Sequence, residues 1–270
     1  MTLASTHMKI VIFILVLVLQ IKITSGQSPI AKTEIIIIGT VHTGNKYFDH
    51  RSLYNILGKY NPDIILNEQD TDFKRVFGLR TANFLKIWKP GIEQLALQKY
   101  SKNNGGVKIL GFDTTFSRKK YIREYIKLNN DFFNIMNGLK MIYTDSLLYA
   151  YYANKSNEYY SLVFNTNLFR LNQPDVTEMS RKLKQMEKTH ILLLGKKYIS
   201  DTTLVQHFEN ELEFWEDRNN YMIRKIIKYS KQYAGKKIII LTGHSHKYYL
   251  VDKLQELESE TIKISEIKED

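Results

Sequence analysis

Two histidines follow apolar runs near opposite ends of the chain, each three positions after a glycine. In EIIIIGTVHTG, His42 follows Gly39, and in KKIIILTGHSHK, His246 follows Gly243. A histidine titrates near neutral pH, so it can act as a general base or as a metal ligand. We expect the glycines to let the chain turn tightly off a strand and the histidines to reach a shared site.

Carboxylates follow two further apolar runs. Glu68 comes directly after DIILN, and Asp113 follows VKILG with Phe112 between them. Each acid could simply cap the next helix, and each histidine could be an ordinary loop residue. Their common placement after apolar runs instead predicts one site. His244 and His246 are two apart, so in an extended chain they point to opposite sides and we expect His246 to face the site.

A long helical segment, residues 201–235, breaks its apolar stripe at two polar residues. Arg218 and Asn219 stand where the stripe needs apolar side chains. A buried guanidinium without a partner is costly, so we expect Arg218 to contact Glu68, Asp113 or an anionic ligand group. The alternative is that the helix protrudes at this point and that Arg218 is solvated.

The apolar runs predict the fold. Four of them are rich in isoleucine and lack alternation, as strands of a parallel sheet buried on both faces do; they cover residues 34–39, 63–67, 107–111 and 237–242. Segments with helical spacing at 49–62, 84–104 and 247–258 predict flanking helices. The fold class is therefore α/β, with a mostly parallel central sheet flanked by helices.

Two further segments complete the predicted architecture. The alternating segment 261–267 is expected to be an edge strand, and about residues 117–200 read as a helical insertion that caps the carboxyl ends of the strands. Ligands of open α/β sheets bind at those ends. The insertion therefore predicts a covered site.

The first residues look like a targeting segment. Residues 10–19 form an apolar run that is too short to span a bilayer, preceded by Lys9 and followed by small residues at 24–26. This pattern predicts a signal peptide over residues 1–26 and a single α/β domain over 27–270. An uncleaved anchor is the alternative. We expect an exported protein, periplasmic or secreted, without a transmembrane span in its mature form.

Composition excludes several kinds of chemistry. The chain has no cysteine, which excludes disulfides, thiolate metal sites and a cysteine nucleophile, and it has no Gly-x-Ser-x-Gly elbow. The net charge of +11 is dispersed rather than clustered. Without a nucleic-acid module we expect no nucleic-acid partner, and at most a weak association with anionic envelope surfaces.

The motifs GTVH (39–42) and GHSH (243–246), with Glu68 and the Arg218-Asn219 pair between them, resemble the TraB/Tiki-like superfamily. That superfamily takes in erythromycin esterase-like, ChaN-like and GumN-related proteins. The resemblance covers about residues 33–258. It implies an α/β fold with a helical insertion and a cleft built from His42, Glu68, Arg218 and His246.

Hydrolysis by activated water is the predicted chemistry, on an ester or peptide bond of a small-molecule or peptide substrate. In a metal version, which we favour because an oxygen and nitrogen ligand set is present, His42, Glu68 and His246 hold a divalent ion. In a metal-free version His42 is the general base and Glu68 orients it. Arg218 would stabilise the oxyanion in either version.

Three further residues are expected to support the site, and one other class of function stays open. Asp113 would orient a histidine, with Asn219 and His244 as further supports. The alternative function is a non-catalytic envelope protein that binds haem, iron or a peptide, which histidines, tyrosines and export would also fit.

Overall fold

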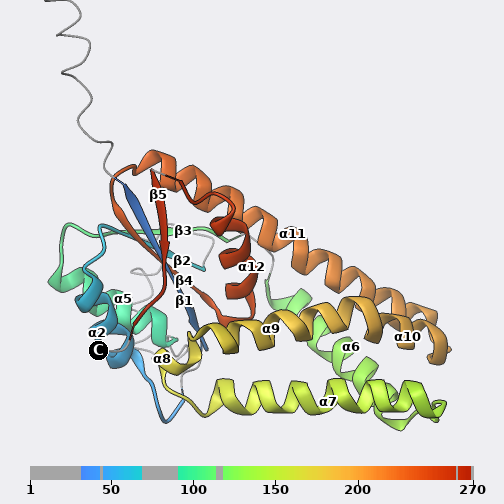
Figure 1. Ribbon diagram of the computed structural model, residues 1–270. Coiled ribbons are helices and arrows are strands. Elements are labelled where there is room, and N and C mark those ends of the chain that lie inside the picture. Colours follow the sequence, from blue (N-terminus) through green and yellow to red (C-terminus); the bar gives the residue numbers. More distant parts are fainter. Residues whose placement is uncertain (1–31, 43–44, 69–90, 114–117, 260, 269–270) are drawn as a thin grey trace, which may run out of the picture.

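The computed structural model describes residues 32–42, 45–68, 91–113, 118–259 and 261–268 (Figure 1). The predicted signal peptide at 1–26 lies outside the described residues. Among the described residues, no helix combines the length and the apolar character that crossing a bilayer would require.

The centre of the fold is a five-stranded sheet in the order β3-β2-β4-β1-β5, with every pair parallel. The strands are β1 (Thr33–Thr40), β2 (Ile64–Asn67), β3 (Lys108–Gly111), β4 (Lys237–Gly243) and β5 (Ile262–Ser265). This confirms the predicted α/β class and its parallel sheet. The last strand lies at the edge, as its alternating sequence predicted.

Helices cover both faces of the sheet, which explains why β1, β2 and β4 are rich in isoleucine. Side chains alternate across a strand, so Ile36 and Ile38 belong to one buried cluster while Ile35 and Ile37 belong to another. The first cluster includes residues of α2 (His50–Tyr60) and α5 (Ile92–Asn103). The second includes residues of α11 (Thr202–Gln232) and α12 (His244–Gln255).

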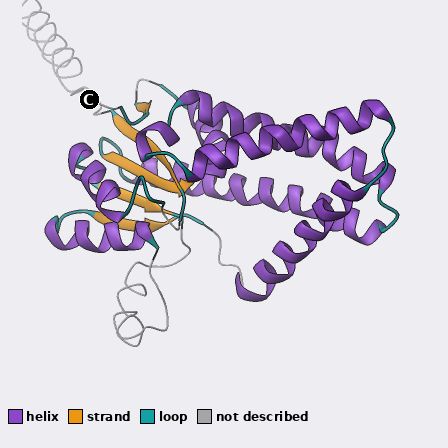
Figure 2. Cartoon of the chain, turned by 90° about the horizontal axis from the view of Figure 1, so that it is seen from below, coloured by secondary structure: helices purple, strands orange, loops and turns teal. Residues whose placement is uncertain are grey.

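A group of helices between β3 and α11 forms a lobe beyond one end of the sheet (Figure 2). It contains α6 (Arg118–Gly138), α7 (Tyr143–Phe164), α8 (Leu168–Leu171), α9 (Pro174–Met186), the π-helix η1 (Glu187–Ile191) and α10 (Leu192–Tyr198). The expected helical character of about residues 117–200 is thereby confirmed. We call these helices, with the first half of α11, the helical lobe.

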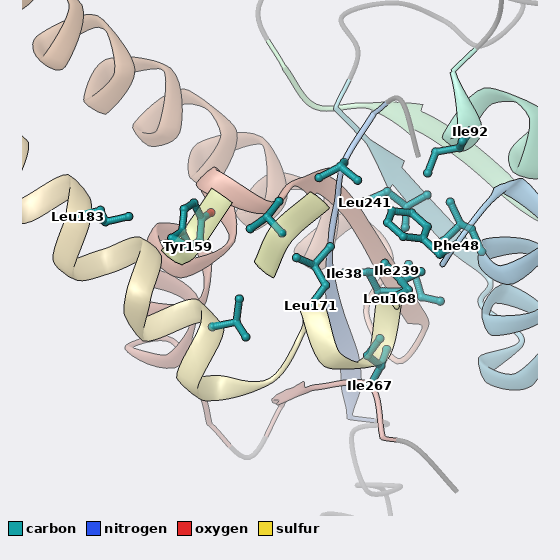
Figure 3. Close-up of a cluster of buried hydrophobic side chains, with 14 of the residues drawn as sticks. Ile38, Phe48, Ile92, Tyr159, Leu168, Leu171, Leu183, Ile239, Leu241 and Ile267 are labelled. Atoms are coloured by element: carbon teal, nitrogen blue, oxygen red, sulfur yellow. The ribbon is translucent and has the colours of Figure 1, made fainter. Parts of the chain in front are cut away.

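The lobe is joined to the sheet where β5 stops pairing. Strand β5 pairs with β1 only as far as Ile36. Further along β1, the side-chain amide of Asn172 accepts a hydrogen bond from the Gly39 N–H (2.7 Å) and donates one to the Gly39 carbonyl (2.9 Å). Asn172 thus replaces a neighbouring strand at this point. Leu168 and Leu171 of α8 lie beside Ile38 in the same buried cluster (Figure 3).

The structure corrects one local expectation. Helix α12 begins at His244, directly after β4, and not at residue 247. His244 and His246 therefore lie on the first helical turn rather than in an extended segment. The expected helix over 84–104 is described as α5 from Ile92, and residues 84–90 lie outside the described part of the chain.

Candidate functional site

The order of the strands brings the predicted site residues to one edge of the sheet. His42 follows β1, Glu68 follows β2 and Asp113 follows β3, while β2 and β1 both border β4. Strand β4 leads straight into α12, whose first turn carries His246. Helix α11 passes the same edge and contributes Arg218. The carboxyl ends of parallel strands are where ligands bind in such sheets.

Arg218 lies at the centre of this group. Its Nε and Nη2 atoms donate to the two carboxylate oxygens of Asp113, at 3.0 and 2.7 Å. Nη2 also donates to Oε1 of Glu68 at 2.6 Å, and Nη1 donates to Nε2 of His246 at 2.9 Å. The contact expected from the broken apolar stripe is thus present with both acids. Burial alone would lower the pKa of Arg218, but the bond to Asp113 and the charge of Glu68 raise it.

Glu68 is buried and held by several donors. Besides Arg218, the hydroxyl of Thr242 donates to Oε2 at 2.8 Å, and the N–H of Gly243 donates to the same oxygen. Burial would raise the pKa of Glu68, but attraction to His246, Arg218 and His42 outweighs it and lowers the pKa to about 2. Arg218 is the partner that stays charged at neutral pH. Glu68 is therefore an ionised carboxylate.

His246 is buried and its two ring nitrogens have different partners. Nδ1 lies 2.7 Å from the amide oxygen of Asn219, so it carries the hydrogen, and Nε2 accepts from Arg218. The ring stacks on Trp215, with centroids 5.3 Å apart and planes at 9°. Burial lowers the pKa of His246 to about 4, against the opposing attraction of Glu68. His246 is thus neutral at pH 7, and its lone pair is used to hold Arg218.

His42 differs from His246 because its side chain is 52% exposed. Its Nδ1 lies 2.9 and 3.1 Å from the two carboxylate oxygens of Glu93. Nδ1 therefore carries a hydrogen and donates it to Glu93. The hydroxyl of Thr40 also donates to Glu93. Nε2 of His42 lies 4.0 Å from Oε1 of Glu68. The arrangement is a histidine oriented by one carboxylate and facing a second.

Glu93 is the functional candidate that sequence reasoning missed. It lies in the first turn of α5, and the N–H of its neighbour Ile92 donates to the His42 carbonyl at 3.3 Å. A signal was present in the sequence. Ala96, Leu97 and Tyr100 define the buried face of this helix, and Glu93 stands three and four residues before the first two, on the same face.

His244 does not share the site with His246. It points into the helical lobe, where its Nδ1 lies 2.8 Å from the hydroxyl of Tyr159. Burial and, after it, the nearby charge of Lys247 together lower the pKa of His244 to about 4. On the first turn of α12, residues two apart point in different directions, so His244 and His246 are separated as they would be in an extended chain. His244 links α12 to α7 through Tyr159.

The three residues expected to hold a metal do not fit one. The two nitrogen atoms, Nε2 of His42 and of His246, lie 4.0 and 3.8 Å from Oε1 of Glu68. The guanidinium of Arg218 occupies the space a cation would need, since it donates to both Oε1 of Glu68 and Nε2 of His246. Among the described residues, no group of three His, Asp or Glu side chains could hold a metal ion.

No family model matches the chain, and no curated protein matches it. A solved structure of an erythromycin esterase mutant in its open conformation is similar over 86% of this chain and 69% of that chain, with 11% sequence identity and a TM-score of 0.34. The resemblance to the TraB/Tiki-like superfamily stays a prediction, and function is argued from the site itself.

Proposed function

We propose that the protein is a hydrolase in which His42 activates water for attack on an ester or peptide bond. The observation that carries the proposal is the placement of His42 between two carboxylates. Glu93 holds its Nδ1 at 2.9 Å, and Glu68 lies 4.0 Å from its Nε2. A base oriented by a second group is the arrangement that general base catalysis requires.

The proposed reaction proceeds without a covalent enzyme intermediate. Nε2 of His42 takes a proton from water, and the resulting hydroxide attacks the carbonyl carbon of the substrate. Glu93 and the ionised Glu68 stabilise the imidazolium that forms. The imidazolium then gives its proton to the leaving oxygen or nitrogen as the bond to the carbonyl carbon breaks, which returns His42 to its starting form.

Arg218 is assigned mainly to positioning. A guanidinium has five N–H donors, and four hydrogen bonds are made to Asp113, Glu68 and His246. The remaining hydrogen on Nη1 is the candidate donor to the developing oxyanion, in line with the role the sequence predicted. Asp113 fixes the guanidinium, and Asn219 fixes the ring of His246. His246 therefore supports the site and is not itself the base.

We infer the metal-free version of the chemistry, because Arg218 fills the position a cation would take. The substrate is an ester or peptide, and neither nucleic acid nor an envelope surface is needed for the reaction. Export to the periplasm or outside the cell stays a prediction. Haem or iron capture is the competing reading. It is less well supported, because the Nε2 lone pair of His246 already accepts from Arg218.

Activity of His42→Ala on a panel of aryl esters and short peptides tests the proposal. We expect the panel to identify a substrate for the unaltered protein, and His42→Ala to lose at least about a hundredfold in kcat. His190→Ala, on an exposed surface histidine, is the matched control and should keep full activity. Full activity of His42→Ala would overturn the proposal.

Two further measurements separate the competing versions. Prolonged dialysis against a chelator should leave activity unchanged, and a loss restored by a divalent ion would overturn the metal-free version. Titration with haem should give no Soret shift dependent on His42. A shift of that kind, together with no turnover on the panel, would favour the binding protein.

A further inference from the structure

A cavity of about 430 Å³ lies inside the helical lobe, next to the candidate site. Helices α6, α7, α9 and α11 line it, together with η1. Trp215 of α11 forms part of its wall and stacks on His246, so one ring borders both the cavity and the site. Glu211 in the same wall is seven residues from Arg218, about 10 Å along the helix. A small organic molecule is long enough to reach from the cavity to Arg218.

Six of the fifteen residues that line the cavity are aromatic. Phe133 and Tyr152 face each other with centroids 6.0 Å apart and planes at 14°. Tyr149, Tyr160 and Trp215 contribute further rings. Offset stacking and edge contacts between rings favour a flat aromatic ligand.

The charged groups of the cavity are already engaged within the protein. Nζ of Lys184 lies 2.6 Å from Oε2 of Glu187, and the hydroxyl of Tyr152 donates to Oε1 of the same carboxylate at 3.0 Å. Burial would lower the pKa of Lys184, but the charge of Glu187 outweighs it and raises the pKa, so Lys184 stays charged. Glu211, the third charged group, also has an interaction of its own.

An incoming ion would therefore lose its hydration without gaining a new counter-charge from the Lys184–Glu187 pair. Neutral groups of Asn157 and Ser156 are also part of the lining and can bond a hydroxyl or an amide. The π-helical turn that begins at Glu187 is a further mark of a functional position, since such turns are frequent at functional sites.

We propose that this cavity binds an uncharged aromatic ring of the substrate, carrying a hydroxyl or amide group. That the ring belongs to a substrate rests on the proposed hydrolase function. Binding of the ring itself does not depend on catalysis. The ring would contact Trp215 directly. Its binding would thus be felt at His246, through the stacked ring, without any contact to His42.

Fluorescence of Trp215 measures ring binding without any turnover. The chain has two tryptophans, so Trp88→Phe leaves Trp215 as the only one. In this background we would titrate 2-phenylethanol, the cationic 2-phenylethylamine and the anionic phenylacetate. The alcohol is expected to give a saturable change with a Kd at least about tenfold lower than either ion, consistent with the desolvation cost of a charge.

Two substitutions on α7 form a matched pair. Ala153 lines the cavity, whereas Ala150 is exposed on the same helix. Ala153→Phe should fill the space and abolish the response to 2-phenylethanol, and Ala150→Phe should leave it unchanged. Both variants need the far-ultraviolet dichroism of the parent. No saturable response in the parent, equal binding of an ion, or unchanged binding by a folded Ala153→Phe would each overturn the proposal.

Failure of ring binding can be told apart from failure of the hydrolase proposal. His42→Ala should retain the response to 2-phenylethanol in full. Ring binding without turnover on any ester or peptide would leave the cavity assignment standing and remove the catalytic one. Turnover of simple esters without ring binding would do the reverse.

Discussion

Nη1 of Arg218 lies 2.9 Å from Nε2 of His246, and this contact fixes the histidine as a hydrogen-bond acceptor. The two histidines of the Gly-x-x-His motifs therefore have different tasks, although their sequences are alike. His246 is buried, neutral and occupied with Arg218. His42 is half exposed and oriented by Glu93. Of the two, His42 is the one placed to exchange a proton with water, as the proposed mechanism requires.

Arg218→Met should strongly destabilise the protein. The substitution leaves the carboxylates of Glu68 and Asp113 buried without their shared guanidinium, and breaking a buried ionic group of this kind costs about 3–5 kcal/mol. The free energy of unfolding in urea measures the loss. Arg224→Met is the matched control on the same helix, because Arg224 is exposed and should cost less than about 0.5 kcal/mol. Similar losses in both variants would contradict a central role for Arg218.

Glu93→Gln should lower kcat by about 10²–10⁴-fold while leaving KM within a factor of a few. Glutamine keeps the size of the side chain but removes the charge that stabilises the imidazolium of His42 and can present the wrong hydrogen-bonding partner to Nδ1. Steady-state kinetics on the best substrate of the panel measures the change. Glu213→Gln, on the exposed side of α11, is the control. A loss confined to KM would mean that Glu93 acts in binding rather than in orienting His42.

Stability should fall as the pH drops from neutrality, first through His246 and then through Glu68. The pKa of His246 is lowered from 6.5 to about 4 on folding, so below pH 6.5 the unfolded chain binds a proton that the folded one does not. The pKa of Glu68 is lowered from 4.5 to about 2, so its stabilisation is present above pH 4.5 and is lost as the pH falls toward 2. Both groups therefore act in the same direction.

Urea unfolding at pH 7.5, 6.0 and 5.0 isolates the part that belongs to His246, because Glu68 stays ionised in both states over most of that window. The difference between pH 7.5 and 5.0 should be about 2 kcal/mol from this residue, at 1.36 kcal/mol for each pH unit below 6.5. His246→Gln should be less stable at pH 7.5 but show a smaller slope. An equal slope in the variant would assign the pH dependence to other groups.

The sheet could be predicted from the sequence because its signal is local. Runs such as Ile35–Ile38 can be buried on both faces only in a covered parallel sheet. The partners of Arg218 were also predictable, since a polar break in an apolar stripe demands a counter-charge. The start of α12 at His244 was not. Gly243 ends β4 and is also the N-cap of α12, with no side-chain cap to mark the boundary.

The roles within the site depended on contacts that no spacing reveals. Glu93 reaches His42 across a segment of fifty residues, and the lone pair of His246 is used by Arg218 only because α11 crosses the sheet at that position. Because α11 places the guanidinium of Arg218 against Glu68 and His246, these two residues and His42 do not fit the metal site that their residue types suggested. Ligand types alone could not show that a guanidinium stands among them.

Gly39→Ala should be destabilising, for a reason other than the tight turn expected from the sequence. Among the described glycines only Gly235 has a positive φ, so Gly39 has no special backbone conformation. A Cβ at Gly39 would lie 2.9 Å from Cδ2 and 3.1 Å from Cα of His244, where α12 approaches β1. Crowding of this kind costs about 1–3 kcal/mol.

Thermal unfolding of Gly39→Ala beside Gly58→Ala checks this. Gly58 lies within α2 with nothing near the position of a Cβ, so alanine there should stabilise the protein by about 0.5–1 kcal/mol. The two substitutions are chemically identical and should have opposite signs. A neutral Gly39→Ala would show that α12 can move away from β1 at no cost.

Gly243→Ala should impair activity more than stability, because its surroundings are the site itself. A Cβ there would lie 3.3 Å from Nε2 of His42 and 3.4 Å from Oε2 of Glu68. The added methyl group would press on the space between the proposed base and the carboxylate that faces it, so kcat should fall by at least about tenfold, in keeping with the sensitivity of catalysis to small displacements. The free energy of unfolding should change by less than for Gly39→Ala, since the exposed ring of His42 can shift. Unchanged kcat in a folded Gly243→Ala would mean that the space between His42 and Glu68 takes no part in the reaction.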